Sequence, residues 1–228
     1  MLSLKRSGIV LLLSVGLLIT SCSSKPYGHY RDNQMIGFID GLDEQEKTVR
    51  FNISEWAKRD EPGPAIEDWG AEYEARVLES TTITNEAGEK LGWVDLRLGQ
   101  KVQINPPSTK VVTDTPDELI ILSMPNEELL MRAGLLASRK GDLRTTVVYG
   151  KGESQPYPLE AFKEEEARIL MNGGYSWMEH DPAYVMDVQK AFRIDAFPVF
   201  LVFDTETLVL KSERLEEVLA FKKERNEQ

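Results

Sequence analysis

The sequence predicts an α+β fold made of two domains, and three features of the chain support this prediction. Residues 35–104 consist of short, partly alternating apolar stretches separated by polar turns, which is the pattern of β-strands. From residue 118 onward, strand-like apolar runs alternate with stretches of helical spacing, as expected of a βαβ arrangement. Residues 105–117 between them contain Pro106, Pro107 and Pro116, which break regular structure. We therefore expect domains at 35–107 and 117–228.

The N-terminus has the composition of a signal peptide. Lys5 and Arg6 form a short positive region, and residues 8–19 form an apolar run. A helix that crosses the hydrocarbon core of a membrane needs about 20 apolar residues, so this run is too short for a permanent span. Residues 1–21 are therefore predicted to be a leader.

The leader ends in Ile19-Thr20-Ser21-Cys22, which resembles the lipobox of bacterial lipoproteins of the Gram-positive type. The resemblance implies that the thiol of Cys22 receives a diacylglycerol group and that cleavage occurs between Ser21 and Cys22. The alternatives are a plain signal peptide with an incidental cysteine, or an uncleaved anchor. Cys22 is the only cysteine, so no intramolecular disulfide can form. We expect a mature protein held by acyl (palmitate-type) chains on the extracytoplasmic face of the cell membrane.

The mature chain is acidic. Loss of the leader, with its two cations, changes the net charge from −11 to −13. This charge opposes binding to nucleic acid, which depends on lysine and arginine neutralising phosphates. It leaves two interpretations open: a soluble, self-repelling surface, or an acidic patch for a cationic partner. Residues 22–34 are polar and are predicted to form a flexible tether.

The first half is predicted to be a small β-barrel. Residues 35–40 and 47–53 form a hairpin, and three more strands are expected at 72–84, 90–98 and 98–104. The opening GFIDGLD (37–43) and the closing WVDLRLGQKVQI (93–104) resemble the small OB-like barrel modules of uncharacterised lipoproteins. This resemblance supports an architecture and implies no chemistry.

Two tryptophans, Trp56 and Trp69, lie in a loop between the predicted strand pairs. They either cap the barrel as part of its core or form an aromatic platform for a sugar or peptide. Exposed aromatic side chains on a rigid scaffold are common binding anchors. Both residues are therefore kept as candidates for a ligand surface.

The second half alternates strands and helices. Asn126 is a candidate helix N-cap, with Glu127 and Glu128 in the first turn. Asp181 is the candidate N-cap of a later helix. Strands are predicted at 118–123, 144–150, 199–203 and 208–211, and helices at 126–141, 159–171, 182–192 and 213–224.

The stretch 181–224 resembles the C-terminal half of the thioredoxin-like superfamily, with Pro198 directly before an apolar strand. In that family the matching proline is usually cis and lies beside the active site. The resemblance places the family's cysteine pair at 124–128, where this chain has no thiol. Dithiol exchange needs an attacking and a resolving thiolate, so redox activity is not carried over, and no catalytic residue is predicted.

Other residues that carry chemistry have structural interpretations. His180 between Glu179 and Asp181 is read as a cap or turn rather than as a metal ligand, because adjacent side chains point in different directions. The glycines match neither a P-loop nor a dinucleotide fingerprint. No metal, cofactor or catalytic site is predicted.

Three functions remain open. The first is a non-catalytic envelope lipoprotein that binds or scaffolds a cell-wall component or another envelope protein. Its candidate surface contains Trp56, Trp69, Trp177 and Pro198. The second is a stress- or sporulation-related surface protein with a structural role. The third is an envelope enzyme that uses a pair of carboxylates.

Overall fold

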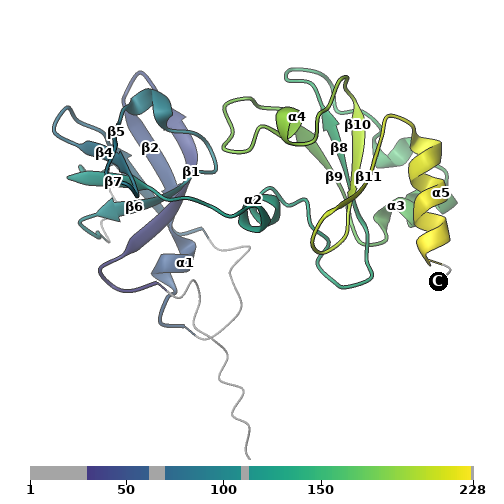
Figure 1. Cartoon of the computed structure of the whole chain (residues 1–228), viewed down its shortest axis with the longest axis horizontal. Coiled ribbons are helices and arrows are strands. Elements are labelled where there is room, and N and C mark those ends of the chain that lie inside the picture. Colours follow the sequence, from purple (N-terminus) through teal and green to yellow (C-terminus); the bar gives the residue numbers. More distant parts are fainter. Residues whose placement is uncertain (1–29, 62–69, 109–112, 227–228) are drawn as a thin grey trace, which may run out of the picture.

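The protein is described by a computed structural model that covers residues 30–61, 70–108 and 113–226 (Figure 1). Its fold is α+β, with one sheet of seven strands and another of four. Figure 1 shows two lobes with helix α2 (Asn126–Arg132) between them. We call the lobe of the seven-stranded sheet the first unit, and residues from α2 onward the second unit. The predicted leader, Ser21, Cys22 and Trp69 lie outside the described residues.

The first unit is a mixed sheet with the strand order β3-β2-β1-β6-β7-β4-β5. The predicted hairpin is confirmed, because β1 and β2 pair antiparallel. In β2, Val49 and Phe51 are buried while Arg50 and Asn52 are exposed, so the alternation in sequence separates core from solvent. The strands are β1 (Met35–Asp43), β2 (Thr48–Asn52), β3 (Glu72–Arg76), β4 (Thr82–Asn85), β5 (Lys90–Leu91), β6 (Lys101–Asn105) and β7 (Glu118–Ile121). The helix α1 (Ser54–Ala57) and the short 3-10 helix η1 (Trp93–Asp95) complete the unit.

The sheet does not close into the predicted barrel. The expected strand 72–84 is interrupted by a turn in which the backbone N–H of Leu78 donates to Thr81 Oγ1 (3.1 Å). As a result β3 pairs with β2, while β4 runs parallel to β7. A single parallel bridge between Ala75 and Asp114 links β3 to the segment before β7. The strand order therefore ends at β3 on one side and at β5 on the other.

The boundary between the units lies later than predicted. Residues 118–121 were expected to be the first strand of the second domain, but β7 pairs with β6 and β4 in the first sheet. Leu119 is fully buried in the core of the first unit, and it lies opposite Ile104 of β6. The prediction of a domain start at residue 117 is therefore wrong in placing this strand.

The end of the predicted tether lies against the first unit. The Tyr30 side chain packs against the first core, and its hydroxyl donates to Glu55 Oε2 (3.1 Å). The Trp56 indole N–H donates to the carbonyl oxygen of Arg31 (3.1 Å). Asp32 forms an ion pair with Arg59 (2.6 Å). The tether prediction is thus wrong for residues 30–32, which have specific partners.

The second unit is a four-stranded sheet with the order β11-β10-β8-β9, covered on both faces (Figure 1). β8 and β9 are parallel and are joined through α3, whereas β10 is antiparallel to both β8 and β11. The elements are β8 (Arg144–Tyr149), the 3-10 helix η2 (Leu159–Ala161), α3 (Glu164–Met171), β9 (Tyr175–Glu179), α4 (Val188–Ala191), β10 (Val199–Phe203), β11 (Leu208–Ser212) and α5 (Leu215–Asn226).

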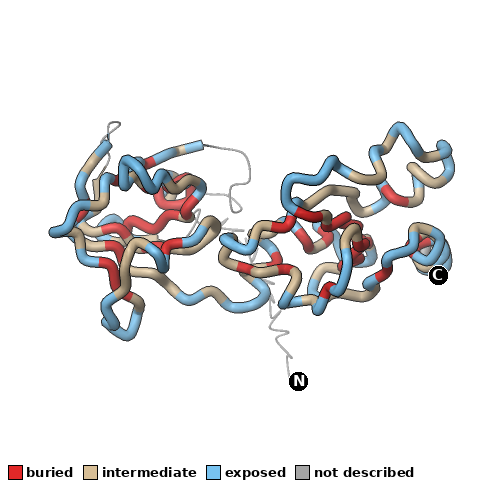
Figure 2. Tube along the Cα trace, turned by 90° about the horizontal axis from the view of Figure 1, so that it is seen from above, coloured by how far each residue is buried: buried red, intermediate tan, exposed pale blue. Residues whose placement is uncertain are grey.

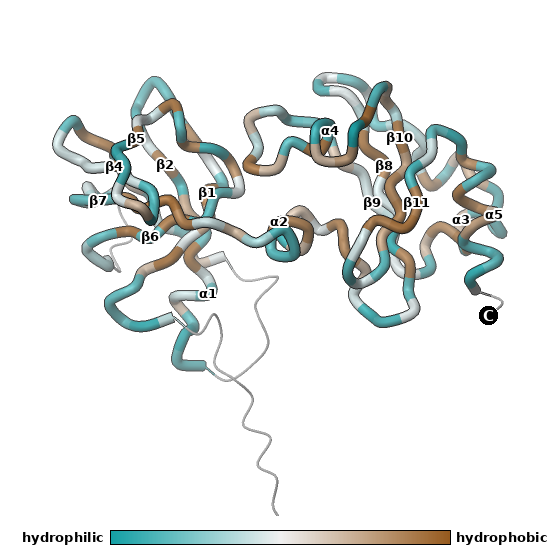
Figure 3. The backbone as a smooth tube through the Cα atoms, viewed as in Figure 1, coloured by the Kyte–Doolittle hydropathy of each residue, from teal (hydrophilic) through white to brown (hydrophobic). Residues whose placement is uncertain are grey.

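Two cores fill the faces of this sheet. One contains Leu130 of α2 and Val188 of α4 together with Leu201, and the other contains Leu170 of α3 and Val218 of α5. Figure 2 shows buried segments within each lobe, and Figure 3 shows α5 alternating between hydrophobic and hydrophilic residues along its length. The first unit and the second unit therefore have separate cores.

Three predicted helices are shorter than expected, and the stretch 126–141 is helical only over Asn126–Arg132. The stretch 159–171 is divided into η2 and α3, and only Val188–Ala191 of the stretch 182–192 is helical. Asp187 caps α4 by accepting from the backbone N–H of Lys190 (3.1 Å), so the assignment of Asp181 as N-cap is wrong.

A buried lysine joins α5 to the rest of the second unit. Lys222 is fully buried, and its ammonium group donates to the carbonyl oxygens of Leu143 (2.8 Å), Leu170 (2.8 Å) and Asn172 (2.7 Å). Burial lowers the pKa of Lys222 from its usual 10.5 to about 8. The lysine thus donates to carbonyl oxygens at the C-terminal end of α3, the region of a helix whose carbonyl groups have no intrahelical partner.

Candidate functional site

The two units meet at an ion pair between their helices. Arg132, the last residue of α2, donates to the buried carboxylate of Glu55 in α1. The same carboxylate accepts the Tyr30 hydroxyl, and the Arg132 guanidinium carbon lies 3.7 Å from the centroid of the Phe38 ring. Because the pair is largely shielded from water, its attraction is screened less than that of a surface pair. The orientation of α2 against the first sheet is therefore supported by charge and by cation–π contact.

A second contact joins the backbones of the units. The N–H of Val185 donates to the carbonyl oxygen of Leu98 (2.8 Å), and Leu98 forms a parallel bridge with Tyr184. Gly99 has φ +82°, and a Cβ atom there would lie 2.5 Å from Cζ of Tyr184. Only glycine allows both this conformation and this close approach. We call the region formed by Glu55, Arg132, Leu98, Gly99 and Tyr184 the junction.

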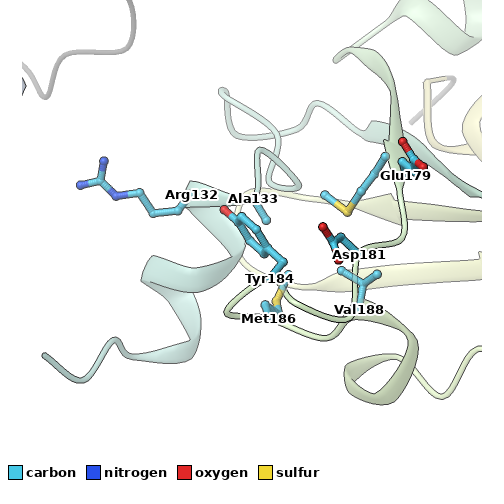
Figure 4. Close-up of a pocket in the computed structure, with 8 residues that line it drawn as sticks. Arg132, Ala133, Glu179, Asp181, Tyr184, Met186 and Val188 are labelled. Atoms are coloured by element: carbon cyan, nitrogen blue, oxygen red, sulfur yellow. The ribbon is translucent and has the colours of Figure 1, made fainter. Parts of the chain in front are cut away.

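Two adjoining cavities open at the junction, and Arg132 and Tyr184 line both of them. The first, of about 410 Å³, lies between the units. The second, of about 260 Å³, belongs to the second unit (Figure 4). The lining of the first is completed by Phe38, Ile39, Asp40, Asn52, Leu98 and Gly99. The lining of the second is completed by Ala133, Met178, Glu179, Asp181, Met186 and Val188.

The smaller cavity combines an apolar wall with a polar rim. Figure 4 shows Tyr184, Met186 and Val188 grouped together, with the Arg132 guanidinium extending away from them. Burial raises the pKa of Tyr184, so its hydroxyl stays protonated and can donate. Methionine side chains are flexible and polarizable, and they adapt to ligands of different shape. The cavity is thus suited to an apolar group with a polar neighbour.

Carboxylates gather where β9 ends. Glu179 Oε1 accepts the N–H of Gly152 (2.7 Å), and Asp181 pairs with Lys151 (3.2 Å). The N–H of Ala183, followed by Lys151, lowers the pKa of Asp181, which is therefore ionised at neutral pH. Glu179 forms no ion pair within the part of the chain that the structure describes. The rim therefore contains one carboxylate, Glu179, that has no ion pair among the described residues, beside the paired Asp181 and Arg132.

His180 stands between Glu179 and Asp181 in the sequence, and its side chain is buried. Its ring lies 5.3 Å from that of Phe197, and its backbone N–H donates to the carbonyl oxygen of Tyr149 (2.8 Å). Its Nδ1 has no hydrogen-bond partner among the described residues. No group of three or more histidine, cysteine, aspartate or glutamate side chains that could hold a metal occurs in residues 30–61, 70–108 and 113–226. His180 thus packs into the second unit.

The predicted ligand surface is not brought together. Trp56 is buried in the first core, which contradicts the aromatic-platform interpretation for this residue. The half-buried Trp177 packs against the α3/α5 face, and its indole N–H donates to the carbonyl oxygen of Pro156 (2.7 Å). The Phe197-Pro198 bond is cis, as is Asn105-Pro106. Trp56, Trp177 and Pro198 are not among the described residues that line the two cavities.

The residues that line the two cavities were not predicted from the sequence. Arg132, Tyr184, Met178 and Met186 come from α2, from the segment before α4 and from β9, and they share no motif or spacing. The one local signal is Gly99, because a glycine before a strand indicates either a turn or a close approach.

Within the described residues, no helix has both the length and the apolar character that a membrane crossing requires. Comparison of the chain with protein-family models, curated proteins and solved structures gives no match.

Proposed function

We propose that this protein is a lipid-anchored binding protein of the cell envelope, and that it binds its ligand non-covalently at the junction between its two units. The lipobox-like segment ending at Cys22 supports the anchor, and the pair of cavities supports the binding role. In this proposal the acyl chains on Cys22 hold the protein to the membrane, and the two units face the cell wall.

The arrangement of the second unit is consistent with a thioredoxin-like fold. The parallel β8-α3-β9 unit is followed by antiparallel β10 and β11 and by the closing helix α5, with Pro198 directly before β10. In this frame the first strand is β8, so the family's cysteine pair corresponds to the loop after Tyr149 rather than to residues 124–128. That loop begins Gly150-Lys151-Gly152-Glu153 and also lacks a thiol. The proposal therefore assigns binding, and not dithiol exchange, to this unit.

The first unit is consistent with a partly open OB-like barrel. β1 pairs antiparallel with both β2 and β6, and the parallel pairing of β4 with β7 continues toward the bridge between Ala75 and Asp114. Folds of this kind serve many functions, so we infer the function from the site and not from the fold.

The observation that carries the proposal is that Arg132 and Tyr184 line both cavities. A ligand that occupies both would contact residues of both units, and the contact between the units would thereby be stabilised by mass action. Sites between structural units are common places for small-molecule binding. The carboxylate-enzyme alternative needs an acidic group whose pKa is raised so that it can donate a proton. Asp181, in the cavity rim, has a lowered pKa and is ionised.

A titration with a neutral apolar fluorophore, N-phenyl-1-naphthylamine, tests the cavity. Ala133 lines the smaller cavity, and Ala133→Trp places an indole in it. Ala161 of η2 is exposed and does not line this cavity, so Ala161→Trp is the matched control. We expect saturable binding of one probe molecule that weakens at least tenfold in Ala133→Trp and is unchanged in Ala161→Trp. Equal binding by all three proteins would contradict the proposal and favour a structural role.

A further inference from the structure

Strand β9 forms one edge of the second sheet, and its outer side has no partner strand among the described residues. Its inner side pairs with β8, as shown by the N–H of Thr145 donating to the carbonyl oxygen of Gly174 (2.9 Å) and the N–H of His180 donating to that of Tyr149 (2.8 Å). Backbone groups alternate in direction along a parallel ladder. Residues 174, 176, 178 and 180 therefore face β8, and the N–H and C=O groups of Tyr175, Trp177 and Glu179 point outward.

This edge lacks the proline, lysine and β-bulge that protect many edge strands. Proteins protect edge strands with proline, lysine, bulges or a covering segment. The sequence of β9, Tyr175–Glu179, has no proline or lysine, and its register with β8 is unbroken over five residues. No outward backbone group of Tyr175, Trp177 or Glu179 has a hydrogen-bond partner within the described part of the chain. The edge can therefore template one further strand.

The edge is continuous with the smaller cavity at the junction. Met178 and Glu179 belong to β9, and both line that cavity. Side chains on a strand alternate between its two faces, so a segment paired with β9 directs every second side chain toward the face that carries Met178. An apolar side chain at such a position has the cavity beside it.

Charge selects the kind of segment. In the cavity lining, Asp181 is paired with Lys151 and Arg132 with Glu55, whereas Glu179 has no ion pair among the described residues. Glu153 lies in the neighbouring loop, and the whole chain carries a net charge of −11. A second copy of this chain would bring a second set of these carboxylates to the edge, so like charges oppose that pairing. A basic segment gains attraction instead, and its backbone bonds are independent of its sequence.

We propose that β9 is a docking edge for an extended basic peptide of a partner protein, which adds to the sheet as a fifth strand and places an apolar side chain in the cavity lined by Met178 and Tyr184. The main-chain bonds provide affinity, and the cavity and rim provide specificity. The inference rests on the proposed function only in its use of this cavity. It identifies the ligand as a peptide of alternating basic and apolar residues.

The probe for the test is a seven-residue peptide of alternating lysine and leucine with blocked ends, and the protein is the chain from residue 22 onward with Cys22→Ser. Hydrogen exchange measured by NMR reports the outward amides directly. We expect saturating peptide to slow exchange at Tyr175, Trp177 and Glu179 at least tenfold. A peptide of alternating glutamate and leucine should produce no slowing. Unchanged exchange at these three amides would overturn the proposal.

Substitutions at one position separate backbone pairing from charge. Glu179→Gln removes the charge and keeps the N–H, whereas Glu179→Pro removes both. We expect the dissociation constant to rise a few-fold in Glu179→Gln and at least a further tenfold in Glu179→Pro. Equal constants for the two variants would overturn docking on this edge. If Glu179→Pro fails to fold, the same comparison uses wild-type protein with a peptide N-methylated at the amides on one edge, which should bind at least tenfold more weakly.

Two further results separate the alternatives. Concentration-dependent protection of the same amides without peptide, together with dimers in sedimentation, would assign the edge to a second copy and overturn the peptide proposal. Binding of N-phenyl-1-naphthylamine that is lost in Ala133→Trp, without any peptide binding, would leave the cavity proposal standing and remove only the docking edge.

Discussion

The carboxylate of Glu55 accepts hydrogen bonds from both Arg132 and Tyr30. One buried acid therefore connects the second unit with Tyr30, which precedes the first strand. This group and the ion pair between Lys101 of β6 and Glu128 of α2 (2.8 Å) together hold α2 against the first sheet, beside both cavities.

Removing either partner of this pair should destabilise the protein. Arg132→Met leaves the Glu55 carboxylate buried with one hydrogen bond fewer, and Glu55→Gln leaves the guanidinium without its counter-charge. Such losses cost about 1–3 kcal/mol each. Urea unfolding of both variants and of the double variant should give a coupling energy of about 0.5–3 kcal/mol. Additive effects would show that the pair contributes no interaction of its own.

Trp56 should behave as a core residue. It is 3% exposed and packs in the first core, so Trp56→Ala removes a large buried side chain and should cost about 3–5 kcal/mol in unfolding free energy. Val94 is 83% exposed, and Val94→Ala should change stability by less than about 0.5 kcal/mol. A ligand platform at Trp56 would give the opposite result, with stability retained and binding lost.

Gly99 should tolerate no side chain. Gly99→Ala places a methyl group against the Tyr184 ring and forces φ +82° on a residue with a Cβ atom. Holding a residue with a Cβ atom in this left-handed backbone conformation costs about 1–2 kcal/mol by itself. We expect lower thermal stability and weaker binding of N-phenyl-1-naphthylamine. Gly88 also has positive φ but open space around it, so Gly88→Ala should show the backbone cost and unchanged probe binding.

Lys222 should make stability depend on pH above neutrality. Burial lowers its pKa to about 8, while the unfolded chain keeps the ordinary value of 10.5. Between these values the unfolded state binds more protons, so the unfolding free energy rises with pH. The difference in unfolding free energy between wild type and Lys222→Met should therefore be constant below pH 8. It should shift in favour of wild type as the pH rises from 8 toward 10.5. Urea unfolding at several pH values measures it, and a flat or falling difference would contradict this account.

The parts of the fold that the sequence predicted correctly depend on local signals. The hairpin of β1 and β2 follows from two apolar runs around a polar turn, and the final strand pair and α5 follow from alternation and helical spacing. Those signals act over a few residues and do not depend on distant parts of the chain.

The errors concern pairing between distant segments. The run 118–121 forms the same kind of strand in either sheet, and only its packing beside Ile104 assigns it to the first unit. The helix predicted from residue 182 begins later because Tyr184 and Val185 pair with Leu98, 86 and 87 positions earlier in the chain. Arg132 and Tyr184 become neighbours through the same contacts, so no spacing rule could have identified the site.

The most direct test of the central claim is the mass of the protein extracted from membranes of the cells that produce it, measured under denaturing and native conditions. We predict a denatured mass that corresponds to residues 22–228 plus a diacylglycerol group, and a native mass that is larger by that of a bound ligand. Cys22→Ala should lose the lipid, and Ala133→Trp should lose the ligand while keeping the lipid. An unlipidated wild type would contradict the anchor. A difference between native and denatured mass that is the same in Ala133→Trp as in wild type would contradict binding at the junction.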